Sequence, residues 1–339
     1  MSSTGQVQDL SDLRTDLINR MRDAVSVTAT NTITDRYLNT ALHDMHLGNP
    51  VVQPWWAIRR GTLITHAPYS TGTVTITAAA RTTVTGSSTL WNTAVTGMGF
   101  NNARAGGKMT FSGATDVHEV STVTSDTVIT LLSRYTGDAL SAATYNYFED
   151  EYALASDFGG FVDMRMFSTD MNIPLIGEMQ FRRLFVRNST TQRPRVACFL
   201  QKAFSGSTTP QYRVGLHPPP DDEYPIPYNY ITTNLAVSTA GAEQTQLSAT
   251  TDEPIMPLRF RHALVARAAA LWFLYYKDDT RFQAAQAEYV EIMQRMAGAL
   301  MVGQDRPRLV AQHGYGGSRR RRRGGRFDLN DDFDYLRDR

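Results

Sequence analysis

The chain has 339 residues, of which 42% are hydrophobic and 20% charged, a composition that predicts a folded protein of about two domains. Its formal net charge of +1 is unevenly spread, because ten arginines and six aspartates from Gln304 onward give +4 and leave −3 for the preceding body. This balance argues against a body that clamps nucleic acid, and the single cysteine, Cys198, excludes an internal disulfide and a multi-cysteine zinc site.

The first fifty residues carry two helical patterns. Apolar residues recur at spacings of three and four at about 11–24 and again at about 32–45, where the second pattern ends at Gly48-Asn49-Pro50. We therefore expect the chain to open with a helical hairpin. We interpret the adjacent indoles Trp55 and Trp56 as a core or subunit contact rather than as a ligand site.

From about Thr62 to Phe148 the pattern changes to the alternation of β-strands. The segment is rich in threonine and valine, and glycine, asparagine, aspartate and serine separate its strands. We expect a small antiparallel β-sandwich or barrel here, inserted between helical parts. A second, shorter β part is expected at about 195–232, where the run from Pro218 to Asp222 forms a turn.

After Pro254 and Pro257 the helical spacing returns in two apolar stripes, which predict a second helical hairpin that ends near residue 302. The longest apolar run, Ala263 to Tyr276, is too short for a membrane span and contains Arg267. The first residues show no basic and then apolar signal pattern. We therefore expect a soluble protein that is not secreted and has no membrane partner.

These elements together predict an α+β fold. The N-terminal and C-terminal helical hairpins are expected to form one helical bundle, the helical core at 1–61 and 149–302, which includes the short β part. The small antiparallel β-sandwich or barrel at 62–148 would be inserted in it. The segment 303–339 would be an extended tail that is disordered or becomes ordered on a partner.

The tail is built from charge and widely spaced aromatic residues. Five consecutive arginines follow a glycine-rich stretch, and an acidic end with apolar anchors follows the arginines. Such a segment cannot bury enough apolar surface to fold alone, but its anchors suit a partner's surface. The candidate docking residues are Arg319, Arg320, Arg321, Arg322, Arg323, Phe327, Phe333, Tyr335 and Leu336.

Three interpretations of this tail are open. A solvated, disordered end is the default for an arginine run. Docking to a partner, with the arginines pairing with carboxylates or with DNA phosphate, is the second. Independent nucleic-acid binding is the least favoured, because the aspartates after the run would cancel much of its field.

The sequence carries no pattern of a catalytic, cofactor or metal site. Phosphate-binding, dinucleotide-binding, serine-hydrolase and zinc-protease motifs are all missing from it. His43 and His46 are three residues apart on a predicted helix, but no further ligands accompany them, so we interpret them as structural. We interpret the acidic runs at 149–151 and 221–223 as solvated loops and Gly106-Gly107 as a turn. We expect a protein that is not an enzyme and has no cofactor.

The order of these parts resembles the head-to-tail adaptor (connector) proteins of tailed bacteriophages over about residues 10–302. The resemblance is carried by the following runs: Asn39 to Met45, Val84 to Trp91, Val120 to Leu131, Glu151 to Phe158, Leu216 to Asp221, and Pro254 to Arg261.

The resemblance implies a structural virion protein. Such adaptors form a ring, usually of twelve subunits, that joins the portal protein to the next tail or neck component, and double-stranded DNA passes through the lumen without sequence-specific binding. The protein would lie in the neck of the virion, and in the host cytoplasm during assembly. Docking of the tail to the portal then becomes the first choice. A mildly acidic body fits a lumen through which DNA slides without sticking.

Two alternatives remain. The chain would be another structural component of the tail, such as a stopper, tail-tube or baseplate protein. Or the β insertion would be a module that binds carbohydrate on the host surface, for which Trp91, Phe100 and Phe111 are the available aromatic residues. These three are few and scattered along the sequence, so the adaptor remains our first hypothesis.

Overall fold

The computed structural model of the chain describes residues 9–21, 31–47, 55–114, 116–166, 171–185, 189–202 and 211–300. By its internal contacts the chain divides into two compact units, Met1–Met296 and Ala297–Arg339. The residue ranges expected for the three domains stay predictions.

The expected fold class, a helical bundle with a small inserted β-sandwich or barrel, is wrong. The described residues contain five α-helices, whereas eighteen strands form four sheets, the largest a curled antiparallel sheet of seven strands. Much of the segment expected as helical core is β-structure. The reason is visible in β1 (Ile58–Ile64) and β10 (Phe158–Met166), which contain glycine and charged residues and therefore show no clear alternation in the sequence. Both pair with β15 (Pro225–Thr232), a strand of the expected short β part.

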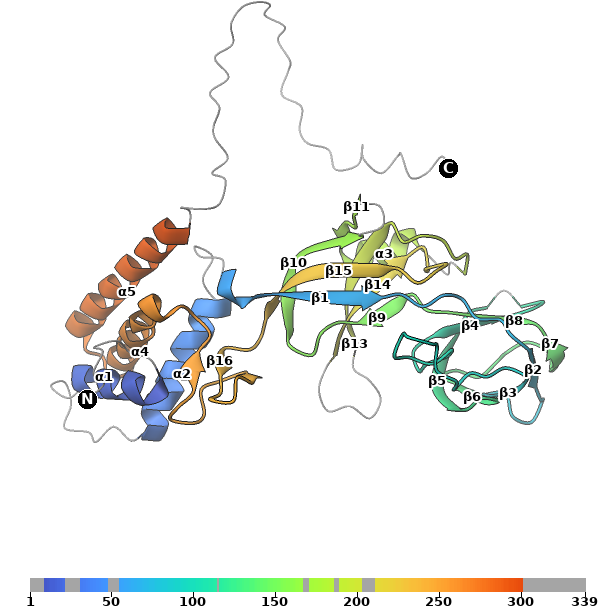
Figure 1. The fold of residues 1–339 in the computed structure, drawn as a ribbon, viewed down its shortest axis with the longest axis horizontal. Helices are drawn as coiled ribbons and strands as arrows, with labels where there is room; N and C mark the ends of the chain where they lie inside the picture. The colour runs from blue at the N-terminus through green and yellow to red at the C-terminus, as the bar shows by residue number, and fades with distance from the viewer. Residues whose placement is uncertain are drawn as a thin grey trace, which may run out of the picture. The chain divides into compact units, whose positions relative to one another are not determined.

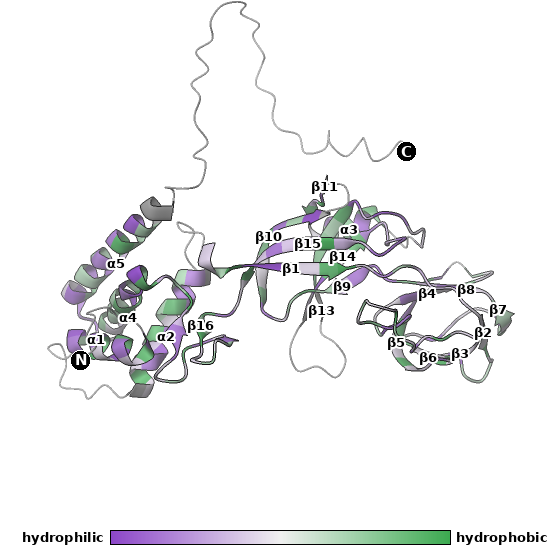
Figure 2. Ribbon diagram, in the orientation of Figure 1, coloured by the Kyte–Doolittle hydropathy of each residue, from purple (hydrophilic) through white to green (hydrophobic). Residues whose placement is uncertain are grey.

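Four of the helices form a helical unit, namely α1 (Leu10–Met21), α2 (Asn31–Leu47), α4 (His262–Tyr275) and α5 (Asp279–Leu300). Helix α4 contacts both α1 and α2 and is buried on nearly all sides, as a helix with alanine and leucine all round requires (Figure 1). Helix α5 is amphipathic, and hydrophobic and hydrophilic residues alternate along it in Figure 2. No helix in the described ranges is long and apolar enough to cross a membrane.

Two four-stranded sheets share one core and form a sandwich. The first has the order β1-β15-β10-β11 and the second the order β12-β13-β14-β9. Their common core contains Leu63, Phe158, Val214 and Tyr228, which come from both sheets. The remaining strands are β1 (Ile58–Ile64), β9 (Glu151–Ala153), β10 (Phe158–Met166), β11 (Met171–Asn172), β12 (Leu175–Ile176), β13 (Val196–Lys202) and β14 (Gln211–His217).

A short helix covers part of the sandwich. Helix α3 (Glu178–Leu184) connects β12 to β13, which run parallel, and it packs against β13. The ring of Phe185, the residue that ends α3, stacks on His217 at 3.8 Å between ring centroids. Since His217 pairs with Val196, the end of α3 lies over the start of β13.

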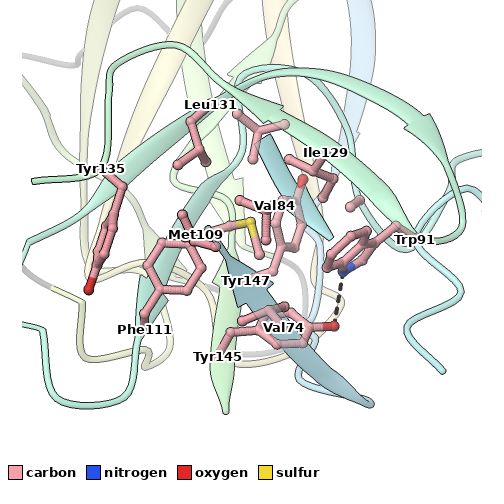
Figure 3. Packing of buried hydrophobic residues seen from close by; sticks show 13 residues of the cluster. Val74, Val84, Trp91, Met109, Phe111, Ile129, Leu131, Tyr135, Tyr145 and Tyr147 are labelled. Carbon is pink, nitrogen blue, oxygen red and sulfur yellow. Dashed lines mark hydrogen bonds between the residues drawn. The ribbon is translucent and has the colours of Figure 1, made fainter. Parts of the chain in front are cut away.

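The seven-stranded sheet curls until its two edges meet. Its order is β7-β2-β3-β6-β5-β4-β8, yet the edge strands β7 and β8 follow one another in the chain with only Thr144 between them. Figure 3 shows its core, in which the Trp91 indole N–H donates to the Tyr145 hydroxyl at 2.9 Å. The strands are β2 (Thr73–Ile76), β3 (Thr83–Ser87), β4 (Lys108–Phe111), β5 (His118–Ser125), β6 (Val128–Leu131), β7 (Leu140–Ala143) and β8 (Tyr145–Phe148).

A three-stranded sheet follows the sandwich and contacts the helices. It consists of β16 (Ala236–Val237), β17 (Glu243–Gln244) and β18 (Glu253–Pro254). The loop between β17 and β18 meets the helices, because the backbone N–H of Leu10 donates to the Asp252 carbonyl at 3.0 Å. Asn39 also exchanges two hydrogen bonds with the backbone of Leu247. The first and last helices are thus tied to one another through the end of the β-structure.

Candidate functional site

Two segments of the chain connect the curled sheet with the sandwich, and they lie side by side. The first follows β1 and leads to Tyr69, and the second is the step from β8 to β9. Tyr69 and Tyr147 exchange two backbone hydrogen bonds of 2.8 Å. The backbone N–H of His66 donates to the Tyr152 hydroxyl at 3.1 Å. These contacts define a junction, by which we mean residues 65–69, 104–108 and 147–152 and the side chains that contact them.

A buried carboxylate organises one half of the junction. Glu149 is almost fully buried and accepts two hydrogen bonds from the guanidinium of Arg104, one of them 2.9 Å long. The Tyr147 hydroxyl donates to the same carboxylate at 2.6 Å. Burial, and then the nearby Glu149 carboxylate, raise the pKa of Tyr147, so its hydroxyl keeps the proton that it donates. A buried charge in a protein needs such partners, and Glu149 has them.

Charged side chains also fill the other half of the junction. Lys108 lies 2.5 Å from Asp150 and 3.6 Å from Glu151, and Glu151 lies 3.6 Å from Arg213. Burial raises the pKa of Asp150. The acidic run at 149–151 is therefore not a solvated loop, as we interpreted it from the sequence. Its charges join the curled sheet to the sandwich.

The junction carries a cavity on each side. The first, of about 430 Å³, lies between β4 and β5 of the curled sheet and the outer face of the sandwich, beneath α3. The second, of about 410 Å³, lies between the loop before β4 and strands β1, β9 and β14. Residues lining the first include Lys108, Glu119, Phe181, Phe185 and His217.

The helical unit has an exposed aromatic surface at the end of α4. Tyr275 is 71% exposed, Leu274 54% and Tyr276 37%. Tyr276 packs against Trp272 at 4.7 Å between centroids, and Trp272 packs against Tyr37 of α2 at 5.5 Å. We call Tyr37, Leu274, Tyr275 and Tyr276 the tyrosine cluster. Tyrosine with a packed base and an exposed tip is enriched at protein interfaces.

A shallow groove of about 440 Å³ runs along α5. Its lining has a single charged residue, Glu291, and Val290 within it is 42% exposed. The lining residues are Phe282, Gln283, Gln286, Ala287, Val290, Glu291 and Gln294. Few charges on an exposed helix face are typical of the centre of a subunit interface.

The residues that the sequence suggested for docking and for metal binding have the following positions in the structure. All the docking residues of the tail, from Arg319 to Leu336, lie outside the described residues. His43 is exposed and His46 is buried against Trp56, and burial lowers the pKa of His46 to about 4. Across the ranges that the structure describes, no three His, Cys, Asp or Glu side chains are grouped to hold a metal ion.

The aromatic residues considered for carbohydrate binding are placed differently. Trp91 and Phe111 are buried in the core of the curled sheet, so neither can stack on a sugar. Phe100 is partly buried and packs between His66 and the guanidinium of Arg104. The β insertion therefore gains no support as a sugar-binding module from these three residues.

Sequence reasoning missed the junction and the tyrosine cluster. The partners in the junction are about 40 residues apart in the sequence, so no local pattern connects Arg104 with Glu149 or Lys108 with Asp150. The cluster had a weak signal, the run Tyr275-Tyr276-Lys277-Asp278 at the end of an apolar helix.

No protein-family model matches the sequence, and a search of curated proteins finds no similar sequence.

Proposed function

We propose that the chain is a subunit of the head-to-tail adaptor ring of a tailed bacteriophage. In this role it joins the portal protein to the next tail or neck component, and double-stranded DNA passes through the lumen of the ring. The order of sequence runs that resembles such adaptors supports the proposal. The predominance of β-structure differs from the helical core that the resemblance implied, so the proposal rests on surfaces suited to assembly.

The observation that carries the proposal is the tyrosine cluster together with the groove on α5. Both lie on the helical unit, the tyrosine cluster at the end of α4 together with Tyr37 of α2, and the groove on α5. A monomeric protein rarely exposes both a Leu-Tyr-Tyr run and a helix groove with a single charged residue, because such surfaces are better buried against another protein. We assign these two surfaces to contacts between neighbouring subunits in the ring.

The tail supplies the contact with the portal in this proposal. Phe327, Phe333, Tyr335 and Leu336 are spaced so that they would anchor an extended segment in grooves of the portal, a mode of binding in which a segment orders on its partner. The mild acidity of the rest of the chain would keep the lumen from holding DNA by phosphate neutralisation.

The test is native mass spectrometry of the protein mixed with the portal ring from the same phage. We expect a closed ring of adaptor subunits, usually twelve, on the portal. Tyr275→Asp should prevent or strongly reduce ring formation, because it places a charge in the proposed subunit contact. Leu132→Asp is the matched control, since Leu132 is 62% exposed on the curled sheet, away from α4 and α5 in the sequence.

Three results would contradict the proposal. One is a protein that never associates with portal at any ratio. Another is a Tyr275→Asp variant that assembles as well as the control. A third is a ring that forms without binding portal, which would favour another tail component such as a stopper, tail-tube or baseplate protein.

A further inference from the structure

The larger cavity at the junction, of about 430 Å³, has an aromatic wall. Phe181 of α3 and Phe185 line it with ring centroids 5.4 Å apart, and one face of Phe185 stacks on His217. Gly215 of β14 lies at the base, where a Cβ atom would come within 3.1 Å of Leu200 and 3.7 Å of Phe181. Glycine at this position keeps the base of the cavity open. Planar, apolar groups can therefore enter against the phenyl rings.

The opposite wall is acidic. Glu119, Asp150 and Glu151 line the cavity, and Glu119 is the cross-strand partner of Lys108. Lys108 pairs with Asp150 and lies near Glu151, which also lies near Arg213. Arg182 also lines the cavity, but it pairs with Glu178 at 2.7 Å, which adds no net charge. Three carboxylates and the two cations Lys108 and Arg182 are therefore among the described residues that line the cavity.

The carboxylate of Asp150 has only one of its two oxygens hydrogen-bonded in the described part of the chain. Its Oδ1 atom is buried and has no hydrogen-bond partner, although Oδ2 accepts from Lys108 at 2.5 Å. Burial raises the pKa of this carboxyl, and the neighbouring Glu151 carboxylate raises it further. A second cation entering from the cavity would relieve both effects. Phosphate groups of DNA would be repelled by the same carboxylates.

The group that best fits an aromatic wall facing a carboxylate wall is a guanidinium. A guanidinium stacks on phenyl rings through its planar face and pairs with carboxylates through its edge. An ammonium ion pairs with carboxylates but has no planar face to stack on a ring. The chain itself carries five such groups in succession, Arg319–Arg323. The 18 residues between Leu300 and Arg319 can span at most ~65 Å when extended.

We propose that the cavity between α3 and the curled sheet accepts arginine side chains of the run Arg319–Arg323 from a second copy of the chain. The arginine run then links one subunit to the next, while the aromatic residues after it, Phe327, Phe333 and Tyr335, remain available to bind the portal. This inference rests on the proposed function only in needing neighbouring copies. Binding to the cavity can be measured without a portal or a virion.

The experiment uses the full-length chain with Arg319–Arg323 all replaced by glutamine, so that its own arginines cannot compete. A fluorescent peptide of residues 314–325 is titrated with this protein, and its polarisation is measured. A second peptide carries lysine in place of each arginine and has the same charge. We expect the lysine peptide to bind about fivefold more weakly or worse, because it loses stacking on Phe181 and Phe185.

Two further substitutions, made in the protein whose Arg319–Arg323 are replaced by glutamine (the glutamine protein), test the aromatic wall and the acidic wall of the cavity. Phe185→Ala should weaken binding of the arginine peptide about tenfold, and Glu119→Gln about threefold, with a smaller effect at high salt. The matched controls are Phe199→Ala and Asp222→Asn, an exposed aromatic and an exposed acidic residue that do not line the cavity. They should leave binding unchanged. Far-ultraviolet circular dichroism checks folding, and Phe185→Leu replaces Phe185→Ala if the alanine variant unfolds.

Several results would overturn the inference. Equal binding of the arginine and lysine peptides would mean that only net charge is recognised. Unchanged binding to both cavity variants would place the peptide elsewhere. Dilute, monomeric protein with its arginines intact should bind the peptide as well as the glutamine protein does. If it does not, the tail of the same chain fills the cavity and the assignment to a second copy is wrong.

Discussion

The core of the curled sheet and the junction beside it are both buried, but they are held together by different interactions. The core of the sheet is apolar, with Val74, Val84, Trp91 and Ile129 all fully buried. The junction instead buries the charged group of Glu149 and satisfies it with Arg104 and Tyr147. An apolar core loses stability in proportion to the volume removed, whereas a buried ion pair loses it when one partner is left alone. The two regions should therefore respond to different substitutions.

The largest expected effect tests the apolar side of this comparison. Trp91→Ala should lower the free energy of unfolding by ~3–5 kcal/mol, because it opens a cavity and leaves the Tyr145 hydroxyl without the indole N–H. Urea unfolding measures it. Trp55→Ala is the control, and since Trp55 is 43% exposed it should cost less than ~1 kcal/mol. Equal effects of the two substitutions would break the account of this core.

The next effect tests the charged side. Glu149→Gln should cost ~2–4 kcal/mol, because it leaves the partly buried guanidinium of Arg104 facing a neutral amide. The control is Glu243→Gln at the Arg59–Glu243 pair, whose two side chains are each about a third exposed. That pair should be worth less than ~1 kcal/mol. If the Glu149 substitution costs no more than its control, solvent reaches the junction and the comparison fails.

A third prediction concerns His46, a buried polar side chain whose ring nitrogens have no hydrogen-bond partner. His46 is buried against Trp56, neither ring nitrogen has a hydrogen-bond partner, and burial, followed by Arg59 and His43, lowers its pKa from 6.5 to about 4. The native state therefore binds this proton less well than the unfolded state does. Its stability should fall as pH falls from 6.5 to about 4, by up to ~3 kcal/mol.

The variant His46→Phe isolates this effect. Phenylalanine keeps a ring against Trp56 but cannot be protonated, so the fall in stability between pH 6.5 and 4 should become smaller. His43→Phe, a change at an exposed position of the same helix, should keep most of the fall, because burial is the first cause of the lowered His46 pKa and His43 is the last. Thermal unfolding at a series of pH values measures both. A His46→Phe profile that matches the parent protein would contradict the assignment.

The smallest effect concerns Asp150, whose pKa is raised by burial above its ordinary value of 3.8. Its native state binds the proton more tightly than the unfolded state, so this group favours folding most below pH 3.8 and loses that contribution as pH rises through the raised pKa. Asp150→Asn should remove this dependence and change the stability at pH 7 by less than ~1 kcal/mol, since Glu151 remains near Lys108. A large loss at pH 7 would mean that the Lys108–Asp150 pair stabilises the junction strongly.

The same contrast explains what the sequence could predict. The five strands β2 to β6 of the curled sheet and the four helices of the helical unit were predicted because their apolar residues recur at every second position in the strands and at every third or fourth in the helices, a local signal. The sequence pattern did not identify β7 and β8. The sandwich was largely missed, because strands such as β10 and β1 contain glycine and charged residues and pair with β15, which is distant in the sequence. The fold class was wrong for that reason.

The candidate surfaces were still harder to predict. The ion pairs of the junction depend on which strands are neighbours, and the sequence shows only the separate charges. The acidic run 149–151 was thus interpreted as a solvated loop. Conversely, Trp91 and Phe111 were considered for binding because aromatic residues suit both cores and ligand sites, and only their burial distinguishes the two.

The most direct measurement of the proposed function is an electron-microscopy map of the protein assembled on portal rings. We predict a ring of subunits on the portal in which the tyrosine cluster and the α5 groove are covered by neighbouring copies, with density for the end of the chain from Phe327 onward against the portal. A map in which the ring is absent, or in which Tyr275 and the α5 groove face solvent, would contradict the account.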